Sequence, residues 1–349
     1  MQAYLSKITS IAARLNLPSS VAISETIIPT EGAVILVEAL ADEGKNNTLE
    51  FANGRVGHLV QGDIIPAVLG KRRALREYSG DIPKAVAPGD ILYLLCESGL
   101  VGEIRGLNAA WGIPMQVKVL GSIIDPITGE QLNIKDAAIA RKHSLPESAP
   151  IVGVVGTCMN IGKTTTIRKL IKHFKGQGLK VAAAKLTGVA SIHDINLIRD
   201  AGAYPVLGFH DGGLPSTCGD ADSVVETALG VLHELNQSNP DLIFVEFGDG
   251  ILGEYNVEHL LRHPDIQQHI CAFIVGAPDF VAAWGAREIM REHGLPITLI
   301  TGPVANNDTG TQYVERNLHL PAESNQHAMP KTIRLVEESL SKMRVLAVA

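Results

Sequence analysis

A segment near the middle of the chain has the residue types of a phosphate-binding loop. It runs from Gly156 to Thr166 and reads Gly-Thr-Cys-Met-Asn-Ile-Gly-Lys-Thr-Thr-Thr. An apolar run over 151–155, typical of a buried strand, precedes it, and apolar residues at helical spacing follow over 167–171. The backbone N–H groups of such a loop face an anion, and Lys163 adds a mobile charge for the outer phosphates. Because the hydroxyl of Thr164 suits Mg²⁺, the segment predicts binding of a nucleotide with its metal ion.

The spacing of this loop differs from the common Gly-x4-Gly-Lys-[Ser/Thr] pattern. Five residues separate Gly156 from Gly162, and Thr157 stands at the regular glycine position. An ordinary helix N-terminus is the alternative interpretation of Gly-Lys-Thr. The predicted nucleotide contacts are the residues of the loop itself: Gly156, Thr157, Asn160, Ile161, Gly162, Lys163, Thr164 and Thr165.

Polar or glycine-rich residues follow each of the five strands that we predict from residue 151 onward. The phosphate-binding loop follows the first strand. Polar or glycine-rich residues also follow the other four predicted strands, which cover 181–184, 242–246, 272–275 and 297–300. The carboxyl ends of parallel strands lie along one edge of a sheet, where ligands gather in this architecture. We therefore expect these segments to form one site.

Two charged residues at these strand ends, and a third before a predicted helix, are candidates for catalysis and metal binding. Glu246 ends an apolar strand, where a carboxylate could bind Mg²⁺ or orient water, or else cap a helix. Lys185 could meet a substrate carboxylate or developing phosphoryl charge, or simply be solvated. Asp194 is a candidate second Mg²⁺ ligand, with His193 a weaker one, although Asp194 also suits a helix N-cap.

Other residues are candidates for contacts with substrate and base. The predicted substrate contacts are Lys185, Thr187, Gly188, Gly248 and Asp249. Asn306 and Asn307 offer donor and acceptor groups suited to a purine edge, or form an Asn-Asn turn. Cys158 is either an activated nucleophile or a small hydrophobic residue. The polar, glycine-rich segment 209–220 suggests a substrate lid.

The remaining pattern predicts two domains, because 349 residues exceed one ordinary domain. Residues 1–145 contain short β-like runs over 32–38, 56–60, 91–95 and 115–120 between turn residues. They predict a small β-rich domain, a barrel or a sandwich, with a short helix over 136–141. A linker over 144–150 leads into residues 151–349, which predict an α/β domain with a mainly parallel sheet. Its helices, expected over 194–201, 223–235 and 331–343 among others, cover both faces of the sheet.

Composition narrows the class of protein. The net charge is −7, and no basic run exceeds 71–73, which disfavours nucleic acid as the main partner. The four cysteines form no Cys-x-x-Cys pair, so we expect neither disulfides nor structural zinc, and a reducing cytoplasm is the simplest setting. No export signal and no apolar run of about 20 residues is evident, so we expect no membrane association.

The loop resembles that of dethiobiotin synthetase and its relatives in the signal-recognition/MinD/BioD-like class of P-loop proteins. The likeness continues over 185–188 and 245–250 and covers roughly residues 151–310. It implies that Lys163 and Lys185 stabilise phosphoryl charge, that Thr164 and Glu246 hold Mg²⁺, and that Asn306 lies at the base. Three departures are Cys158 in place of an acidic residue, Leu186 in place of proline, and Gly-Asp-Gly over 248–250 in place of Gly-Ala-Gly-Gly.

Two further similarities imply other functions. The segment 198–203 resembles the Arg-x-x-Ala-Gly-Ala segment of the GTP-binding accessory proteins of molybdopterin-guanine-dinucleotide synthesis. The loop is also similar to that of the two-domain family that includes D-glutamate N-acetyltransferases.

The leading hypothesis is a Mg²⁺- and ATP-dependent, ligase-like enzyme that activates a small carboxylate or amine by phosphoryl transfer. A GTP-dependent accessory factor for cofactor insertion and an acyl-CoA-dependent N-acyltransferase are the alternatives. By resemblance alone we expect a homodimer.

Overall fold

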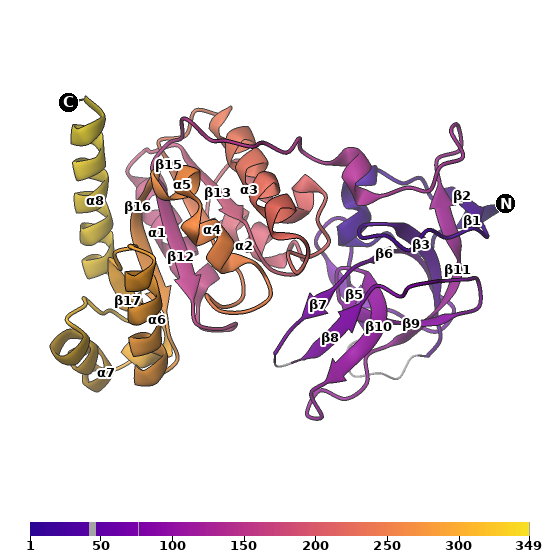
Figure 1. Ribbon diagram of the computed structural model, residues 1–349, viewed down its shortest axis with the longest axis horizontal. Coiled ribbons are helices and arrows are strands. Elements are labelled where there is room, and N and C mark those ends of the chain that lie inside the picture. Colours follow the sequence, from indigo (N-terminus) through magenta and orange to yellow (C-terminus); the bar gives the residue numbers. More distant parts are fainter. Residues whose placement is uncertain (42–46, 76, 349) are drawn as a thin grey trace. The chain divides into compact units, whose positions relative to one another are not determined.

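The computed structural model describes residues 1–41, 47–75 and 77–348, and these form two compact units (Figure 1). The first unit comprises Met1–Ala140, Val189–His193 and Phe209–Asp220. The second comprises Arg141–Gly188, Asp194–Gly208 and Ala221–Ala349, of which residue 349 is not described. The predicted domain boundaries, 1–145 and 151–349, stay a prediction. That prediction did not include the two later segments, Val189–His193 and Phe209–Asp220, that belong to the first unit.

Within the described residues of the first unit, five strands close into a barrel. They are β3 (Val34–Ala39), β6 (Ile64–Leu69), β9 (Ile91–Cys96), β10 (Leu100–Leu107) and β11 (Gln116–Ile124). Strand β11 pairs with β3, β3 with β6, β6 with β10, β10 with β9, and β9 again with β11. Only the pairing of β6 with β10 is parallel among these five. The closed ring leaves none of the five as a free sheet edge.

Shorter elements flank the barrel. Strands β1 (Gln2–Tyr4) and β2 (Ser20–Ser24) extend from β11, and β7 (Arg72–Arg73) and β8 (Tyr78–Asp81) extend from β10. Strands β4 (Thr48–Glu50) and β5 (Val56–His58) form a separate hairpin. The core consists of buried aliphatic side chains, among them Ile35, Val37, Leu49, Ile65, Leu69, Val101 and Val117.

The helix predicted over 136–141 is wrong. The chain forms a 3₁₀ helix η1 at Ser10–Leu15 and a single 3₁₀ turn, η2, at Ile134–Ala137. Reciprocal hydrogen bonds between Asn133 and the start of η2 close this turn as a capping box. Ala138 is already extended, so the helix stops there.

The second unit confirms the predicted α/β architecture. Its sheet has the order β14-β13-β15-β12-β16-β17, and every pairing is parallel. The strands are β12 (Ile151–Gly156), β13 (Val181–Lys185), β14 (Val206–Gly208), β15 (Leu242–Glu246), β16 (Ile270–Gly276) and β17 (Leu299–Thr301). Every residue of β12, β13 and β15 is buried, which is why these strands appear as continuous apolar runs.

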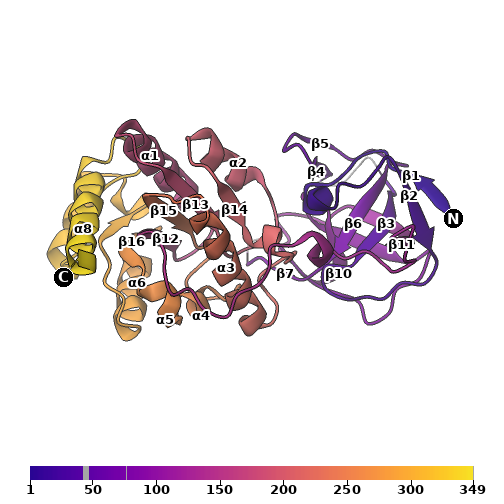
Figure 2. The ribbon, with the colours of Figure 1, turned by 90° about the horizontal axis from the view of Figure 1, so that it is seen from above.

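Helices cover both faces of this sheet (Figure 2). Helices α1 (Lys163–Gly176), α2 (His193–Asp200) and α8 (Pro330–Val348) share one hydrophobic cluster with the strands. Helices α3 (Ala221–Asn236) and α6 (Phe280–Glu292) lie on the opposite face. The shorter elements are α4 (Val257–Arg262), α5 (Pro264–Gln267), α7 (Asp308–Tyr313), the 3₁₀ helices η3 (Phe209–Gly212) and η4 (Pro303–Ala305), and the π-helical η5 (Val314–Leu318). None of the described helices is long and apolar enough to cross a membrane.

The loops that leave β13 and β14 enter the first unit. Val189 forms a β-bridge with Ser216, and the N–H of Ala190 donates to Pro215 O at 3.0 Å. The segment 209–220, interpreted above as a lid, is mostly buried, and its Asp211 pairs with Arg14 at 2.9 Å. This packing is that of a structural segment, so the lid interpretation is not retained.

Candidate functional site

The site begins where β12 ends and α1 starts. Strand β12 ends at Gly156 and α1 begins at Lys163, so the predicted strand, loop and helix are all present. Strand β12 lies between β15 and β16 in the sheet, and the chain order reverses around it. In doubly wound sheets this reversal point is where ligands bind, beyond the carboxyl ends of the strands.

The conformation of the loop depends on Gly162 and on a distant asparagine. Gly162 is the N-cap of α1 with φ of +88°, and its carbonyl accepts a hydrogen bond from Nδ2 of Asn325 at 3.1 Å. The same Nδ2 donates to Oγ1 of Thr166 at 3.2 Å, and Asn325 is 1% exposed. Asn325 therefore braces the start of α1. Sequence reasoning missed it, because a lone asparagine in a turn-rich segment carries no signal.

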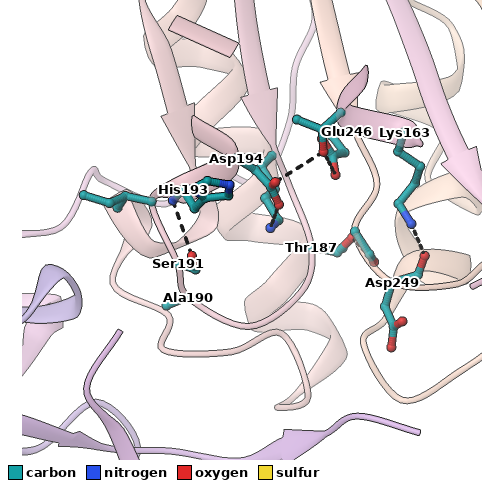
Figure 3. A network of polar contacts seen from close by, with 12 residues as sticks. Lys163, Thr187, Ala190, Ser191, His193, Asp194, Glu246 and Asp249 are labelled. Carbon is teal, nitrogen blue, oxygen red and sulfur yellow. Dashed lines mark hydrogen bonds and ion pairs between the residues drawn. The ribbon is translucent and has the colours of Figure 1, made fainter. Parts of the chain in front are cut away.

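Two backbone carbonyls hold the ammonium group of Lys163. Its Nζ donates to Cys158 O at 2.9 Å and to Asp249 O at 2.7 Å, and the contact with Asp249 is visible in Figure 3. Burial lowers the pKa of Lys163, and the side chain is 7% exposed. The ammonium group of Lys163 is therefore a buried cation whose hydrogen-bond acceptors are neutral carbonyls. A bound anion would stabilise its charge.

Two carboxylates converge on the hydroxyl of Thr164. Its Oγ1 lies 3.0 and 3.2 Å from the two carboxylate oxygens of Glu246 and 3.3 Å from Oδ1 of Asp194. A hydroxyl has one hydrogen, so it cannot donate to both carboxylates at once. The hydroxyl of Thr164 therefore neutralises neither carboxylate, and two negative groups lie close together at this point.

The two carboxylates, Asp194 and Glu246, differ in how closely a positive charge approaches them. Nζ of Lys185 lies 2.5 Å from Oδ2 of Asp194, so Asp194 has a close cation. Burial, and next the negative charge of Asp194, raise the pKa of Glu246, which is 3% exposed. A divalent cation would relieve the unfavourable charge on Glu246.

The oxygen atoms at this point suit Mg²⁺, an ion that needs only a few ligands from the protein. In the described part of the chain, no three His, Cys, Asp or Glu side chains converge as a metal site. Mg²⁺ commonly takes one or two carboxylates and completes its shell with water and substrate phosphates. Thr164, Asp194 and Glu246 match that pattern, so the residues present fit the predicted ion.

The loops predicted to contact substrate are tied to one another. Oγ1 of Thr187 donates to Gly248 O at 3.0 Å, and a Cβ on Gly248 would lie 2.2 Å from Thr187 O. Gly250 approaches the carbonyl of Thr157 in the same way, and its added Cβ would lie 2.7 Å away. The loops after β12, β13 and β15 therefore pack backbone to backbone. Gly188 begins the excursion into the first unit with φ of +127°.

The other residues of the loop either support its conformation or leave polar groups available for a ligand. Ile161 is buried below Gly156, where a Cβ would lie 2.3 Å from its Cδ1, and Asn160 has φ of +61°. Oγ1 of Thr157 is buried and has no hydrogen-bond partner among the described residues. A buried hydroxyl of the loop without a partner suits a ligand oxygen. Thr165, on the first turn of α1, is partly exposed.

The two predicted base contacts have different surroundings. Asn307 caps α7, because its side chain accepts from the N–H of Gly310 at 2.9 Å. Asn306 is exposed, and its Oδ1 accepts from the hydroxyl of Ser324 at 3.2 Å. The structural role of Asn307 favours the turn interpretation for that residue, and the role of Asn306 at a base stays a prediction.

The structure places several of the predicted site residues close together, and their roles stay predictions. The structure brings together Lys163, Thr164, Lys185, Asp194 and Glu246 through the contacts given above. Figure 3 labels three members of this group, Lys163, Asp194 and Glu246, and shows Asp249 beside the ammonium group of Lys163. The fold and this loop define an α/β unit with P-loop geometry.

Comparison with known proteins gives only distant likenesses. No protein-family model matches the chain, and no curated protein matches it. The signal recognition particle receptor FtsY of Elizabethkingia anophelis in complex with GDP is 17% identical, over 56% of this chain and 64% of that one, with a TM-score of 0.39. The signal recognition particle 54 kDa protein of Aeropyrum pernix K1 in complex with GDP is 18% identical, over 58% and 50%, with a TM-score of 0.37.

A third solved structure, FtsY of Thermotoga maritima, is 20% identical, over 58% and 71% of the two chains, with a TM-score of 0.37. This chain spans less than two thirds of the first two structures. At this level of likeness the comparisons assign no activity, and nothing in them supports dethiobiotin synthetase specifically.

Proposed function

We propose that the chain binds a nucleoside triphosphate with Mg²⁺ and transfers or hydrolyses its terminal phosphoryl group. The observation that carries this proposal is the cluster at the carboxyl edge of the sheet. There, a buried lysine on a glycine-bounded loop lies beside a hydroxyl that two carboxylates approach. Positioning and charge neutralisation are what phosphoryl transfer requires from a protein.

Lys163 would stabilise the outer phosphates. Its two present acceptors, the carbonyls of Cys158 and Asp249, are neutral, and burial makes its charge unfavourable. Exchange of one carbonyl for a phosphate oxygen would give the ammonium group a charged partner, and such hydrogen bonds are stronger than neutral ones.

Thr164, Glu246 and Asp194 would hold the metal ion. Bound there, Mg²⁺ supplies charge neutralisation between the phosphates. The two carboxylates also argue against the acyl-CoA alternative, because they would repel a pyrophosphate that arrives without a divalent ion. The geometry therefore favours a metal–nucleotide complex over a coenzyme A cradle.

Lys185 is the candidate contact for an anionic acceptor. It is a buried residue whose ammonium group pairs with Asp194 at 2.5 Å, which places a cation beside the proposed metal ligand. Activation of a small carboxylate or amine is the finer form of this proposal, and transfer to water is the simpler form. The choice between ATP and GTP, the homodimer and the cytoplasmic location stay predictions.

A direct test compares Lys163→Ala with Lys172→Ala. Lys172 is an exposed lysine on the same helix, so its replacement controls for loss of charge from α1. Titration with fluorescent ATP and GTP analogues in Mg²⁺, together with phosphate release, measures binding and turnover. A charge-assisted hydrogen bond contributes about 1.5–3 kcal/mol, so we expect Lys163→Ala to bind at least about tenfold more weakly.

Three outcomes of this test would contradict the proposal. They are wild-type affinity in Lys163→Ala, the same loss in Lys172→Ala, and absence of nucleotide binding in the wild type. Tight binding of coenzyme A that is independent of Mg²⁺ would instead support the acyltransferase alternative.

A further inference from the structure

Glu50 in the first unit is a buried carboxylate that binds the segment leading into the candidate site. It ends β4, is 0% exposed and has three hydrogen-bond donors. The hydroxyl of Ser10 donates to Oε2 at 2.5 Å, the N–H of Ile192 donates to Oε2 at 2.9 Å, and the hydroxyl of Ser191 lies 3.2 Å from Oε1. Two of these three donors belong to the inserted segment Val189–His193.

The inserted segment is fixed at several further points within the same unit. The thiol of Cys96 donates to Ala190 O at 3.6 Å, and the N–H of Ala190 donates to Pro215 O at 3.0 Å. Val189 also forms a bridge with Ser216. Glu50 holds the end of the segment that is nearest in sequence to Asp194.

The path from Glu50 to Asp194 is short and covalent. One residue, His193, separates Ile192 from Asp194, so their Cα atoms are at most about 7.6 Å apart. Oγ of Ser191 accepts from the N–H of His193 at 3.3 Å, at the start of α2. The contacts of Glu50 therefore fix both the residue before α2 and the hydroxyl that orients its first turn.

We infer that Glu50 is a positioning residue for the proposed metal ligand Asp194, and that it acts through the segment that leads into α2. The inference rests on the proposed function, since it gives Asp194 a metal to hold. Glu50 itself contacts neither metal nor nucleotide in this scheme. Its effect passes through Ser191 and Ile192 to the start of α2.

Two substitutions separate the hydrogen bonds of Glu50 from its negative charge. In Glu50→Gln, the amide oxygen can accept from Ser10 and Ile192, and the amide nitrogen can donate to Ser191. In Glu50→Ala all three contacts are lost. If geometry is what matters, the glutamine variant retains function and the alanine variant does not.

The test measures how much Mg²⁺ strengthens nucleotide binding, as the ratio of the Kd in EDTA to the Kd in Mg²⁺. Loss of a group that orients a metal ligand commonly weakens metal binding about 10–100-fold. We expect Glu50→Ala and Asp194→Asn each to lower the ratio about tenfold, with little change in the Kd measured in EDTA. Glu50→Gln should stay within about twofold of the wild type. The double variant Glu50→Ala with Asp194→Asn should lose no more than Asp194→Asn alone.

Ser10→Ala is the matched structural control. It removes a buried hydrogen bond of the same carboxylate but leaves the contacts with Ser191 and Ile192. A merely structural role for Glu50 predicts that Ser10→Ala and Glu50→Ala lower the ratio alike, and that result would overturn the inference.

Ser191→Ala serves if Glu50→Ala does not fold, because it breaks one link on a partly exposed residue. We expect Ser191→Ala to lower the ratio about threefold, which is less than the effect of Glu50→Ala because only one of the hydrogen bonds of Glu50 is lost. An unchanged ratio in Ser191→Ala and Glu50→Ala would also overturn the inference. A wild type that binds no nucleotide would overturn the proposed function instead, so the two failures are distinguishable.

Discussion

Replacement of Gly162 by alanine tests how the phosphate loop is held. Gly162 has φ of +88°, and an added Cβ would lie 2.3 Å from Nδ2 of Asn325. The left-handed conformation alone costs alanine about 1–2 kcal/mol. Displacement of Asn325 breaks its hydrogen bonds to Gly162 O at 3.1 Å and to Thr166 Oγ1 at 3.2 Å. Each such bond contributes about 0.5–1.5 kcal/mol, so we expect Gly162→Ala to lower the free energy of unfolding by about 2–5 kcal/mol.

Gly178 provides the control for backbone strain. It has φ of +87°, but nothing lies within 4 Å of an added Cβ, so Gly178→Ala should cost only the about 1–2 kcal/mol of the left-handed conformation. Urea unfolding followed by circular dichroism measures both variants. In an Asn325→Ala background the cost of Gly162→Ala should fall to that of Gly178→Ala. Equal losses for the two glycine variants in the wild-type background would refute the argument that Asn325 braces the loop.

Two further predictions follow from the shifted pKa values. The pKa of Glu246 is raised above its ordinary value of 4.5 in the folded chain, first by burial and then by Asp194. Its contribution to stability is therefore present below pH 4.5 and is lost as the pH rises through the raised folded value. We expect Glu246→Gln without nucleotide to gain thermal stability over the wild type as the pH is raised from about 5 to 8; parallel pH profiles would contradict this. Burial raises the pKa of Cys271 to about 12, and its thiol donates to Ile151 O at 3.2 Å. At pH 8 only about one Cys271 in ten thousand is a thiolate. Because Cys271 is only partly buried, the raised pKa is what should slow its labelling by iodoacetamide in the folded chain relative to urea, as mass spectrometry would show; equal labelling rates in the two conditions would contradict the raised pKa.

The centre of the candidate site is predictable from sequence because its signals are local. A strand buried on both faces appears as a continuous apolar run, as in β12 and β15, and the residue that ends it is then easy to locate. Parallel strands bring these ends to one edge, so Lys163, Lys185 and Glu246 follow from chain order and the parallel sheet alone. The structure adds the partners of these side chains: Asp249 for Lys163, Asp194 for Lys185 and Thr164 for Glu246.

The supporting residues are not predictable in this way, because their partners lie far along the chain. Asn325 is 163 residues from Gly162, and Glu50 is 142 residues from Ile192. No periodicity or motif relates such positions. The closure of the barrel is hidden for the same reason, since it depends on which strands pair, such as β6 with β10 in parallel, and not on the strands themselves.

The chain path before Asp194 shows how this proposed metal ligand is held. After Lys185 and Thr187 the chain leaves the second unit at Gly188, passes through Val189–His193 in the first, and returns at Asp194. The ion pair between Lys185 and Asp194 at 2.5 Å joins the two ends of this excursion, while Glu50 holds its middle. A segment fixed at both ends and in its middle has little freedom to adjust on its own. A change that moves Ile192 is therefore expected to strain the ion pair between Lys185 and Asp194 or to shift Asp194, the proposed metal ligand.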